Sequence, residues 1–458
     1  MDTQFAYAQH HADRILDELK EFLRIPSIGT LNTHADDTRR AAEWLRDHCL
    51  GVGMARAELM ETPGHPIVYA EWLEAGPDAP TVLVYGHYDV QPADDPRNEW
   101  LSRAFEPVIR DGNIYARGAI DDKGQLFMHL KVFEGLMQSE GRFPVNIKMM
   151  FEGEEESGST NLEPFIRDHL DLLACDVVVI SDTAMQGEDS PSMDYGLRGL
   201  LYTEITITGL RTDLHSGYGG TVPNPAQALV QILAKMHDAN GRIQVPGFYD
   251  DVQELTPQER EALAANPITE DDWKQQRGVE ALWGEPGYTF LERFGARPTL
   301  EINGLVSGWT GQGAKTVIGA DALAKVSCRL VPNQDPQKIL QALKDYVRHL
   351  TPPGLHSEVR PLGASAPGVV VPIDAPPMRA AREAMTATFG REPIMTRNGG
   401  TIPVVSLYQE LLNVPVLLIG FGLPDDNLHA PNEKMTLSMF FKGIDTLALF
   451  YPRLQDAM

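Results

Sequence analysis

The sequence predicts an α/β fold with a mostly parallel sheet, into which a separate α+β domain is inserted. Over the first and last parts of the chain, short apolar runs alternate with helical patterns, as in parallel strands joined by crossover helices. In the middle of the chain, apolar and polar residues alternate within strand patterns, which is typical of a sheet with one exposed face. We therefore expect a discontinuous α/β domain over 1–198 and 371–458, and an α+β domain over 199–370.

The first expected element is an amphipathic helix near the N-terminus. Its apolar face consists of Ile15, Leu16, Leu19, Phe22 and Leu23. This segment lacks the basic-then-apolar order of a secretory signal peptide. The chain also has three widely separated cysteines, Cys49, Cys175 and Cys328. Their odd number and apolar surroundings favour reduced thiols, so we expect a cytoplasmic protein.

Four apolar runs with strand character follow, and each one ends at polar residues that can coordinate a metal ion. The runs are TVLVY (81–85), VNIKMMF (145–151), DVVVI (176–180) and VPVLLIGFG (414–422). They lead into His87, into the glutamates of 152–156, into Asp182 and into the loop of His429. Ligands of mostly parallel sheets collect at the carboxyl ends of the strands, so these polar endings lie where a site is expected.

The middle of the chain supplies the elements of the inserted domain. They are a strand at 200–209, a helix at 224–240, a strand at 324–331, a helix at 335–350 and a strand at 355–362. Prolines just beyond 350 end the second helix. Residues 241–300 are rich in proline, glycine and charge, and we assign no element to them.

Charge and hydropathy exclude several classes of partner. The 458 residues carry a formal net charge of −25, which argues against binding to nucleic acid or to an anionic membrane. No apolar run reaches the roughly 18 residues that a membrane-spanning helix needs. The partner we expect is a small molecule.

The polar strand ends could together hold metal ions. Two imidazoles and several carboxylates suit Zn²⁺, with Mn²⁺ as the next choice. The candidate residues are His87, Asp121, Glu155, Glu156, Asp182 and His429. A carboxylate shared by two ions would hold them about 3.5 to 4 Å apart, and a water between them loses its proton near neutral pH. A carboxylate that is not a ligand could accept that proton.

Each of these signals also has a purely structural interpretation. A histidine at a strand end is more often structural than a ligand, and Asp182 could be a helix N-cap. An acidic run such as 152–156 is usually a solvated face. The coincidence of ligand-type residues at four strand ends favours a metal site.

Other catalytic motifs are incomplete or missing. The segment GWTGQGAKT (308–316) is similar to a phosphate loop, but Ala314 interrupts the required ending and a strand-like stretch follows. The chain contains no H-E-x-x-H motif and no G-x-S-x-G motif.

Seven motifs, in family order, resemble those of the M20 metallopeptidases, and most closely the dipeptidase branch that includes carnosine dipeptidases. They are GHYDVQP (86–92), ARGAIDDKG (116–124), FEGEEESGS (151–159), SDT (181–183), DLHSGYGG (213–220), GAKTVI (313–318) and LHAPNEK (428–434). The resemblance covers most of the chain. It implies a di-metal peptidase domain of the α/β class with an inserted α+β lid and dimerisation domain.

The resemblance also implies a role for each candidate ligand. His87 and Asp182 would hold one ion, and Glu156 and His429 would hold the other. Asp121 would bridge the two ions.

Three further residues would take part in catalysis on the same grounds. Glu155 would be the general base, and Asp89 would orient the imidazole of His87. His215 would stabilise the oxyanion, either in its own subunit or in a partner subunit.

The substrate would be bound by residues that match short family motifs. These are Arg329, Asn303, Gly400 and Thr401. Arginine suits this role because its guanidinium binds a carboxylate through two parallel hydrogen bonds. The resemblance also implies a homodimer formed through the inserted domain.

The resulting hypothesis is metal-dependent hydrolysis of dipeptides or short peptides with a free C-terminal carboxylate. Two divalent ions per subunit would serve it, with Zn²⁺ preferred to Mn²⁺. One alternative is deacylation of N-acyl amino acids by the same site, although Tyr88 favours the dipeptidase branch. The other is a non-catalytic member that binds metal or peptide, which Glu155 disfavours because it adds a base beside the ligand Glu156.

Overall fold

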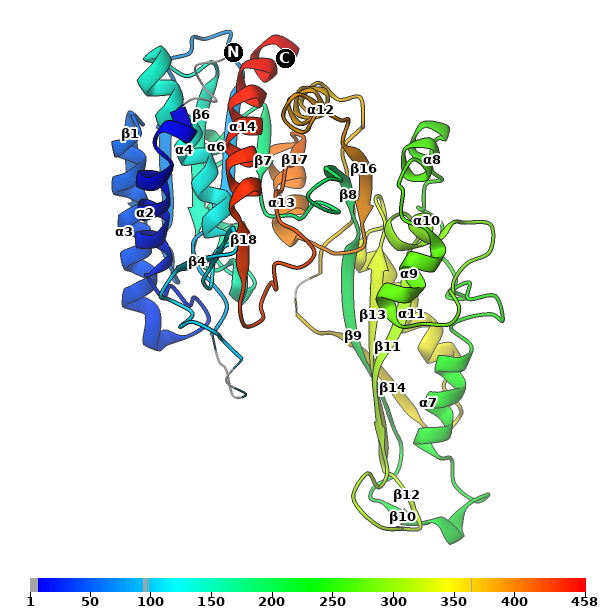
Figure 1. Ribbon diagram of the computed structural model, residues 1–458. Coiled ribbons are helices and arrows are strands. Elements are labelled where there is room, and N and C mark those ends of the chain that lie inside the picture. The colour runs from blue at the N-terminus through cyan, green and yellow to red at the C-terminus, as the bar shows by residue number, and fades with distance from the viewer. Residues whose placement is uncertain (1–6, 94–96, 98, 364) are drawn as a thin grey trace. The chain divides into compact units, whose positions relative to one another are not determined.

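The computed structural model describes residues 7–93, 97, 99–363 and 365–458 (Figure 1). The first six residues of the predicted α/β domain therefore lie outside the described part of the chain. The chain divides into two compact units: unit 1 comprises Met1–Tyr195, Val371–Met395 and Leu407–Met458, and unit 2 comprises Gly196–Val370 and Thr396–Ser406. The segment Thr396–Ser406 groups with unit 2, whereas the sequence analysis placed it in the α/β domain.

Unit 1 is built on a six-stranded mixed sheet. In spatial order its strands are β1 (Arg56–Met60), β2 (Ile67–Trp72), β6 (Asn146–Glu152), β3 (Thr81–His87), β7 (Val177–Ile180) and β17 (Val416–Leu418). Strands β6, β3, β7 and β17 run parallel to one another. At one edge, β2 is antiparallel to β6, and β1 is antiparallel to β2. The parallel strands are the four apolar runs of the sequence, which confirms the α/β class.

A layer of helices packs against this sheet. Its members are α2 (Ala12–Leu23), α3 (Ala35–Gly51), α4 (Lys123–Glu140), α12 (Pro376–Phe389) and α14 (Leu437–Ala457). Helix α4 contacts α2, α3, α14 and strand β3, so it lies at the centre of the layer (Figure 1). It ends at Gly141, whose φ of 69° is the left-handed conformation that commonly closes a helix.

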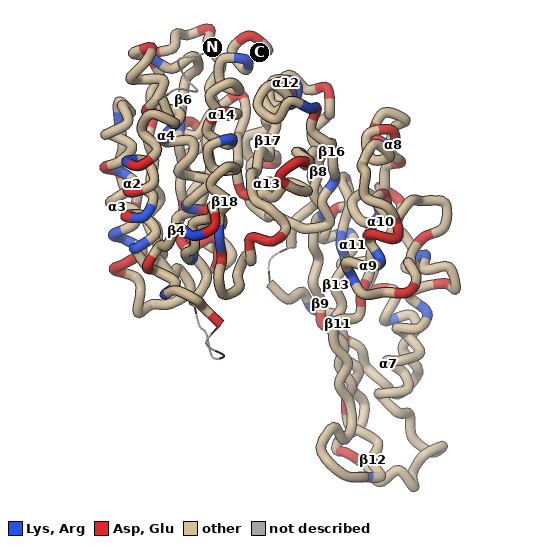
Figure 2. The backbone as a smooth tube through the Cα atoms, in the orientation of Figure 1, with Lys and Arg blue, Asp and Glu red and all other residues tan. Residues whose placement is uncertain are grey.

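Acidic and basic side chains intermingle on the outer helices of unit 1. Figure 2 shows acidic and basic residues interspersed along α2 and α3. Lys20 pairs with Asp17 on α2, and Arg39 pairs with Glu43 on α3. No described helix is long and apolar enough to cross a membrane.

Unit 2 is built on a four-stranded antiparallel sheet. Its strands, in spatial order, are β11 (Thr299–Ser307), β13 (Asp321–Leu330), β9 (Gly199–Thr208) and β14 (His356–Pro361). The helices α7 (Pro225–Ala234) and α11 (Pro336–Leu350) share a hydrophobic core with every second residue of β13, including Ala324, Val326 and Cys328. Apart from β11, to which the sequence analysis assigned no element, these are the elements predicted for the inserted α+β domain.

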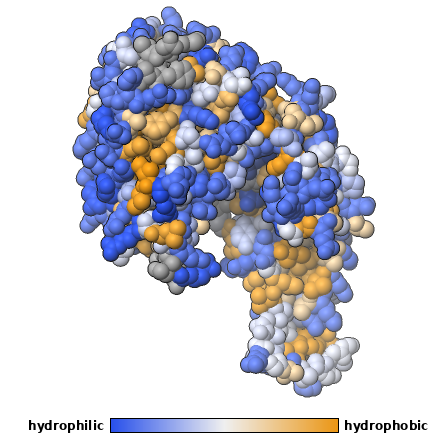
Figure 3. All heavy atoms as spheres, in the orientation of Figure 1, coloured by the Kyte–Doolittle hydropathy of each residue, from blue (hydrophilic) through white to orange (hydrophobic). Residues whose placement is uncertain are grey.

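The edge strand β11 leaves apolar side chains uncovered. Ile302, Leu305 and Val306 are between 48% and 56% exposed, and apolar side chains gather over this part of the molecule (Figure 3). The strand β11 is therefore an exposed apolar edge of the sheet, and such edges often mark an interface with another protein chain.

The unassigned segment 241–300 contains three short helices. They are α8 (Pro257–Ala264), α9 (Glu270–Arg277) and α10 (Phe290–Gly295). Each begins with a capping box, in which a threonine and an acidic residue three positions later bond to each other's backbone N–H. The spacing Thr-x-x-Glu or Thr-x-x-Asp was visible in the sequence and could have located all three.

The remaining elements are short. The strands are β4 (Val108–Arg110), β5 (Asn113–Tyr115), β8 (Ser192–Leu197), β10 (Leu214–His215), β12 (Val317–Ile318), β15 (Val369–Val370), β16 (Ile394–Asn398) and β18 (Lys434–Thr436). The helices and single 3-10 turns are η1 (Asn32–His34), η2 (Glu155–Ser157), η3 (Ser216–Tyr218), α5 (Leu162–Asp168), α6 (Leu170–Leu173) and α13 (Pro403–Leu412). Strands β4, β5 and β18 form a small antiparallel sheet in unit 1.

Candidate metal centre

The carboxyl ends of adjacent strands in unit 1 carry the predicted ligands. His87 is the last residue of β3, and Asp182 follows β7 by two positions. Glu156 lies in the turn η2, which follows β6. Because β6, β3 and β7 are parallel neighbours, their polar ends meet at one edge of the sheet.

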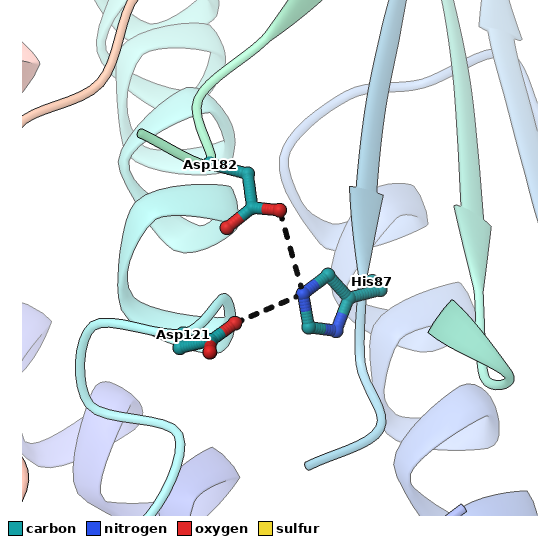
Figure 4. A group of neighbouring side chains, drawn as sticks. All are labelled: His87, Asp121 and Asp182. Atoms are coloured by element: carbon teal, nitrogen blue, oxygen red, sulfur yellow. Dashed lines mark ion pairs between the residues drawn. The ribbon is translucent and has the colours of Figure 1, made fainter. Parts of the chain in front are cut away.

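A buried group of three ligands forms around His87. Its Nε2 atom lies 3.1 Å from Oδ1 of Asp121 and 3.8 Å from Oδ2 of Asp182 (Figure 4). On the other side of the ring, Nδ1 donates to the carbonyl oxygen of Asp89 at 3.1 Å. This bond orients the ring so that Nε2 faces the two carboxylates, as a metal ligand requires.

A second, more open group forms around His429. Its Nε2 atom lies 2.8 Å from Oδ2 of Asp121 and 3.4 Å from Oε2 of Glu156. The His429 side chain is 54% exposed, and its backbone has a φ of 58°. The two oxygens of Asp121 thus face different imidazoles, which is the arrangement of a bridging carboxylate.

The residues of both groups fit divalent cations. In each group the three ligand atoms lie within 4.8 Å of one another. Nε2 of His87 is buried without a hydrogen-bond partner among the described residues, and such atoms are rare unless something else binds them. The donor set of imidazole nitrogen and carboxylate oxygen suits Zn²⁺ and also Mn²⁺.

The electrostatics of the site reflect concentrated negative charge. Burial alone would lower the pKa of His87, but the carboxylates of Asp121 and Asp89 raise it well above its usual value. The pKa of His429 rises to about 10 because Asp121 and Glu156 accept hydrogen bonds from its ring. Burial, reinforced by the charge of Asp121, raises the pKa of Asp182 well above that of an ordinary aspartate. The raised pKa values of these three side chains indicate an excess of negative charge in the site. Bound cations would neutralise this charge.

Glu155 belongs to neither ligand group. Burial raises the pKa of its carboxyl group to about 7, and the charge of His87 opposes that rise. The Asp89 carboxylate accepts hydrogen bonds from the backbone N–H of Glu155 at 3.3 Å and of Glu156 at 3.1 Å. Asp89 therefore contacts both the His87 ring and the turn that carries the two glutamates.

The predicted substrate-binding residues and His215 all lie in unit 2. Nη1 of Arg329 donates to Oγ1 of Thr401 at 2.8 Å, and Gly400 precedes Thr401 in the same segment. His215 lies in the separate β10–β12 ladder, where its Nε2 is 3.3 Å from Oγ1 of Thr316. Asn303 is an exposed residue at the bulge of β11. The structure thus brings Arg329 and Thr401 together and places His215 and Asn303 on other elements.

Glu152 and Glu154, for which the sequence suggested no role, both form hydrogen bonds in the structure. Glu152 is buried and accepts hydrogen bonds from Tyr85 Oη at 2.5 Å and Ser159 Oγ at 3.0 Å. Glu154 accepts two hydrogen bonds from Nδ2 of Asn161, at 2.9 and 3.1 Å. These carboxylates organise the turn around Glu155 instead of forming part of a ligand group.

Sequence reasoning missed three residues that support the ligands. Nε2 of Gln91 donates to Oε2 of Glu156 at 2.7 Å. Arg117 and Glu433 form a buried ion pair beside Asp121. All three lie inside motifs that were noted. Arg117 is a charged residue between Ala116 and Gly118, which was an available signal, whereas Glu433 lies between the polar residues Asn432 and Lys434 and had none.

The fold and the two ligand groups define the class of the protein, a metallopeptidase whose candidate metal ligands form two adjacent groups. The sequence model described as "Peptidase family M20/M25/M40" matches residues 83–452, and the chain belongs to this family. This result confirms the resemblance on which the sequence analysis relied.

Relatives of similar length are identical to this chain at about a third of the aligned positions. The chain is 33% identical to "Cys-Gly metallodipeptidase dug1" of Schizosaccharomyces pombe, over 97% of this chain and 96% of the relative. It is 31% identical to the human "Beta-Ala-His dipeptidase", over 98% and 92% of the two chains. The solved structure of the M20 family metallo-carboxypeptidase Sso-CP2 from Sulfolobus solfataricus superposes with a TM-score of 0.84 at 34% identity, over 96% and 99%. The predicted dipeptidase branch is confirmed.

Proposed function

We propose that this protein hydrolyses dipeptides, or short peptides with a free C-terminal carboxylate, with two divalent ions per subunit. One observation carries the proposal: the two oxygens of Asp121 lie 3.1 Å from Nε2 of His87 and 2.8 Å from Nε2 of His429. A carboxylate placed in this way can serve two ions at once. His87 and Asp182 would hold one ion, and His429 and Glu156 would hold the other. Zn²⁺ is the preferred ion and Mn²⁺ the alternative.

Glu155 is the proposed general base. When bound, two such ions would polarise a water molecule and the carbonyl group of the substrate. A carboxylate whose pKa lies near 7 is suited to accept a proton at neutral pH and to return it to the leaving amine. Asp89 keeps this carboxylate in place, because it accepts hydrogen bonds from the backbone of the same turn.

Unit 2 is proposed to bind the substrate and to form the lid and the dimer contact. Arg329, with Gly400 and Thr401 beside it, is the proposed site for the C-terminal carboxylate, and Asn303 is a further contact. His215 is the proposed oxyanion donor. The exposed apolar edge of β11 supports a homodimer through this unit, because isolated edges of this kind tend to pair. The three cysteines are free, which supports a cytoplasmic location.

Chelation and substrate choice test this function together. We expect a strong chelator to abolish hydrolysis of a panel of unmodified dipeptides, and added Zn²⁺ or Mn²⁺ to restore it. Dipeptides with an amidated C-terminus serve as the matched substrates, and they should be cleaved poorly because they lack the carboxylate. Activity that is indifferent to chelation would contradict the metal mechanism. Faster turnover of N-acyl amino acids than of any dipeptide would favour the deacylase alternative.

A further inference from the structure

A buried ion pair joins two segments of unit 1 that carry proposed ligands. Nη1 of Arg117 donates to Oε2 of Glu433 at 2.6 Å, and the two residues are only 2% and 0% exposed. Buried ion pairs seldom stabilise a fold more than apolar residues of similar volume would. The presence of this pair therefore calls for a reason other than stability.

The small sheet of β4, β5 and β18 brings the pair together. Tyr115 of β5 lies opposite Lys434 of β18, and the backbone N–H of Ala116 donates to the carbonyl oxygen of Glu433 at 3.1 Å. The residue after β5 and the residue before β18 are consequently held side by side. This register places the Arg117 side chain within reach of the Glu433 carboxylate.

The second oxygen of Glu433 holds the backbone at Asp121. Oε1 accepts hydrogen bonds from the N–H of Ile120 at 3.1 Å and from the N–H of Asp121 at 3.3 Å. Charge-assisted bonds of this type are stronger than those between neutral groups. Glu433 thus fixes the main chain of the residue that faces both His87 and His429.

Arg117 extends the same connection to the segment of His87. Its Nη2 donates to the carbonyl oxygen of Pro92 at 3.3 Å, and Pro92 follows His87 and Asp89 in one motif. Glu433 in turn lies four residues after His429. One ion pair therefore links the three segments that carry His87, Asp121 and His429.

We propose that Arg117 and Glu433 are positioning residues that hold Asp121 between the two histidines and so set the affinity of the centre for its ions. This inference rests on the proposed function, because the placement of Asp121 matters only if its carboxylate bridges two cations. Groups that support metal ligands in this way typically contribute about 10- to 100-fold to metal affinity. Among the described residues, the pair forms no hydrogen bond with a ligand side chain, and its bonds to Asp121 are to the backbone.

Two variants that conserve charge test the proposal. Glu433→Asp keeps the carboxylate but shortens its reach toward Ile120 and Asp121. Arg117→Lys keeps the positive charge but cannot bond to Glu433 and Pro92 through a planar fork. Each protein is stripped with a chelator and titrated with Zn²⁺ in competition with a metal-binding dye, under conditions in which near-UV circular dichroism shows the native fold. We expect Zn²⁺ to bind about 10- to 100-fold more weakly to both variants than to the unmodified protein.

The matched control is Glu285→Asp in unit 2. Glu285 forms an ion pair of similar burial with Arg297, the two side chains being 8% and 5% exposed. The control should bind Zn²⁺ as the unmodified protein does. Folded Glu433→Asp and Arg117→Lys proteins with unchanged Zn²⁺ affinity would overturn the positioning role. An unmodified protein that fails to bind two ions would instead refute the proposed function, so the two failures are distinguishable.

Discussion

The two ligand groups share Asp121 but differ in their surroundings. The His87 side chain is fully buried, whereas the His429 side chain is 54% exposed. His87 ends a central strand of the sheet, and His429 lies in a loop with a left-handed backbone. Left-handed residues other than glycine are uncommon and need support from the structure around them.

This difference shows two ways in which a fold can position a group of metal ligands. The buried group follows from the parallel sheet, because the ends of neighbouring strands must meet. The open group depends on contacts that a loop makes at a distance, such as those of His429 with Asp121 and Glu156. We therefore expect the two groups to respond differently when a ligand is removed.

The largest effects should come from His87→Ala and His429→Ala. Each removes a ligand of one ion and disturbs Asp121, so each should lower kcat/KM at least about ten-thousandfold, because an ion supplies several kcal/mol of transition-state stabilisation. The variants should differ in stability. In the metal-free protein, His87→Ala removes a fully buried partner of the Asp121 carboxylate and should cost about 3 kcal/mol or more. His429→Ala removes an exposed partner and should cost about 1 kcal/mol or less.

Urea unfolding of both chelator-treated variants, beside the unmodified protein, measures this contrast. Equal losses of unfolding free energy would mean that burial does not distinguish the two groups.

The next effect in size concerns Glu155, which belongs to neither group. Glu155→Gln should lower kcat between about a hundredfold and ten-thousandfold, the usual contribution of a general base. Its bound metal, measured by elemental analysis, should stay at the level of the unmodified protein. Glu154→Gln is the matched control, because Glu154 is the adjacent acid and its carboxylate accepts hydrogen bonds from Asn161. Near-normal turnover by Glu155→Gln would show that another residue accepts the proton.

The contrast between the two groups also explains what the sequence could predict. His87 and Asp182 follow apolar runs, and the topology of parallel sheets brings such positions together without further information. The pairing of Arg117 with Glu433 spans 316 positions and depends on the register of β5 with β18. These two strands are only three residues long, too short to give a recognisable alternation pattern. The helices of 241–300 were missed for a different reason: their apolar faces are weak, and only their capping boxes identify them.

The smallest effect concerns the support behind the buried group. Nε2 of His129 is 2.8 Å from Oγ of Ser181, the residue before Asp182, and its Nδ1 is 2.7 Å from Oη of Tyr451. Burial lowers the pKa of His129 to about 3, so the ring stays neutral in the folded protein. In the unfolded chain the same ring titrates near 6.5. Its contribution to stability is therefore complete above pH 6.5 and is lost as the pH falls toward 3, at up to about 1.4 kcal/mol per pH unit.

His129→Gln removes this titration, so the unfolding free energy of the variant should fall less steeply between pH 6.5 and pH 4.5. At pH 8 the variant should be less stable by about 1 kcal/mol, because its hydrogen bonds are weaker. Ser181→Ala is the control, because it removes the hydrogen bond but keeps the buried imidazole, and it should retain the slope of the unmodified protein. Urea unfolding of metal-free protein at several pH values measures both slopes. Parallel curves for His129→Gln and the unmodified protein would mean that the acid sensitivity of unit 1 arises from its carboxylates. A flatter curve would instead trace part of that sensitivity to the neutral imidazole that supports the strand end of Asp182. In the open group, the side chain that supports Glu156 is the amide of Gln91, which does not titrate.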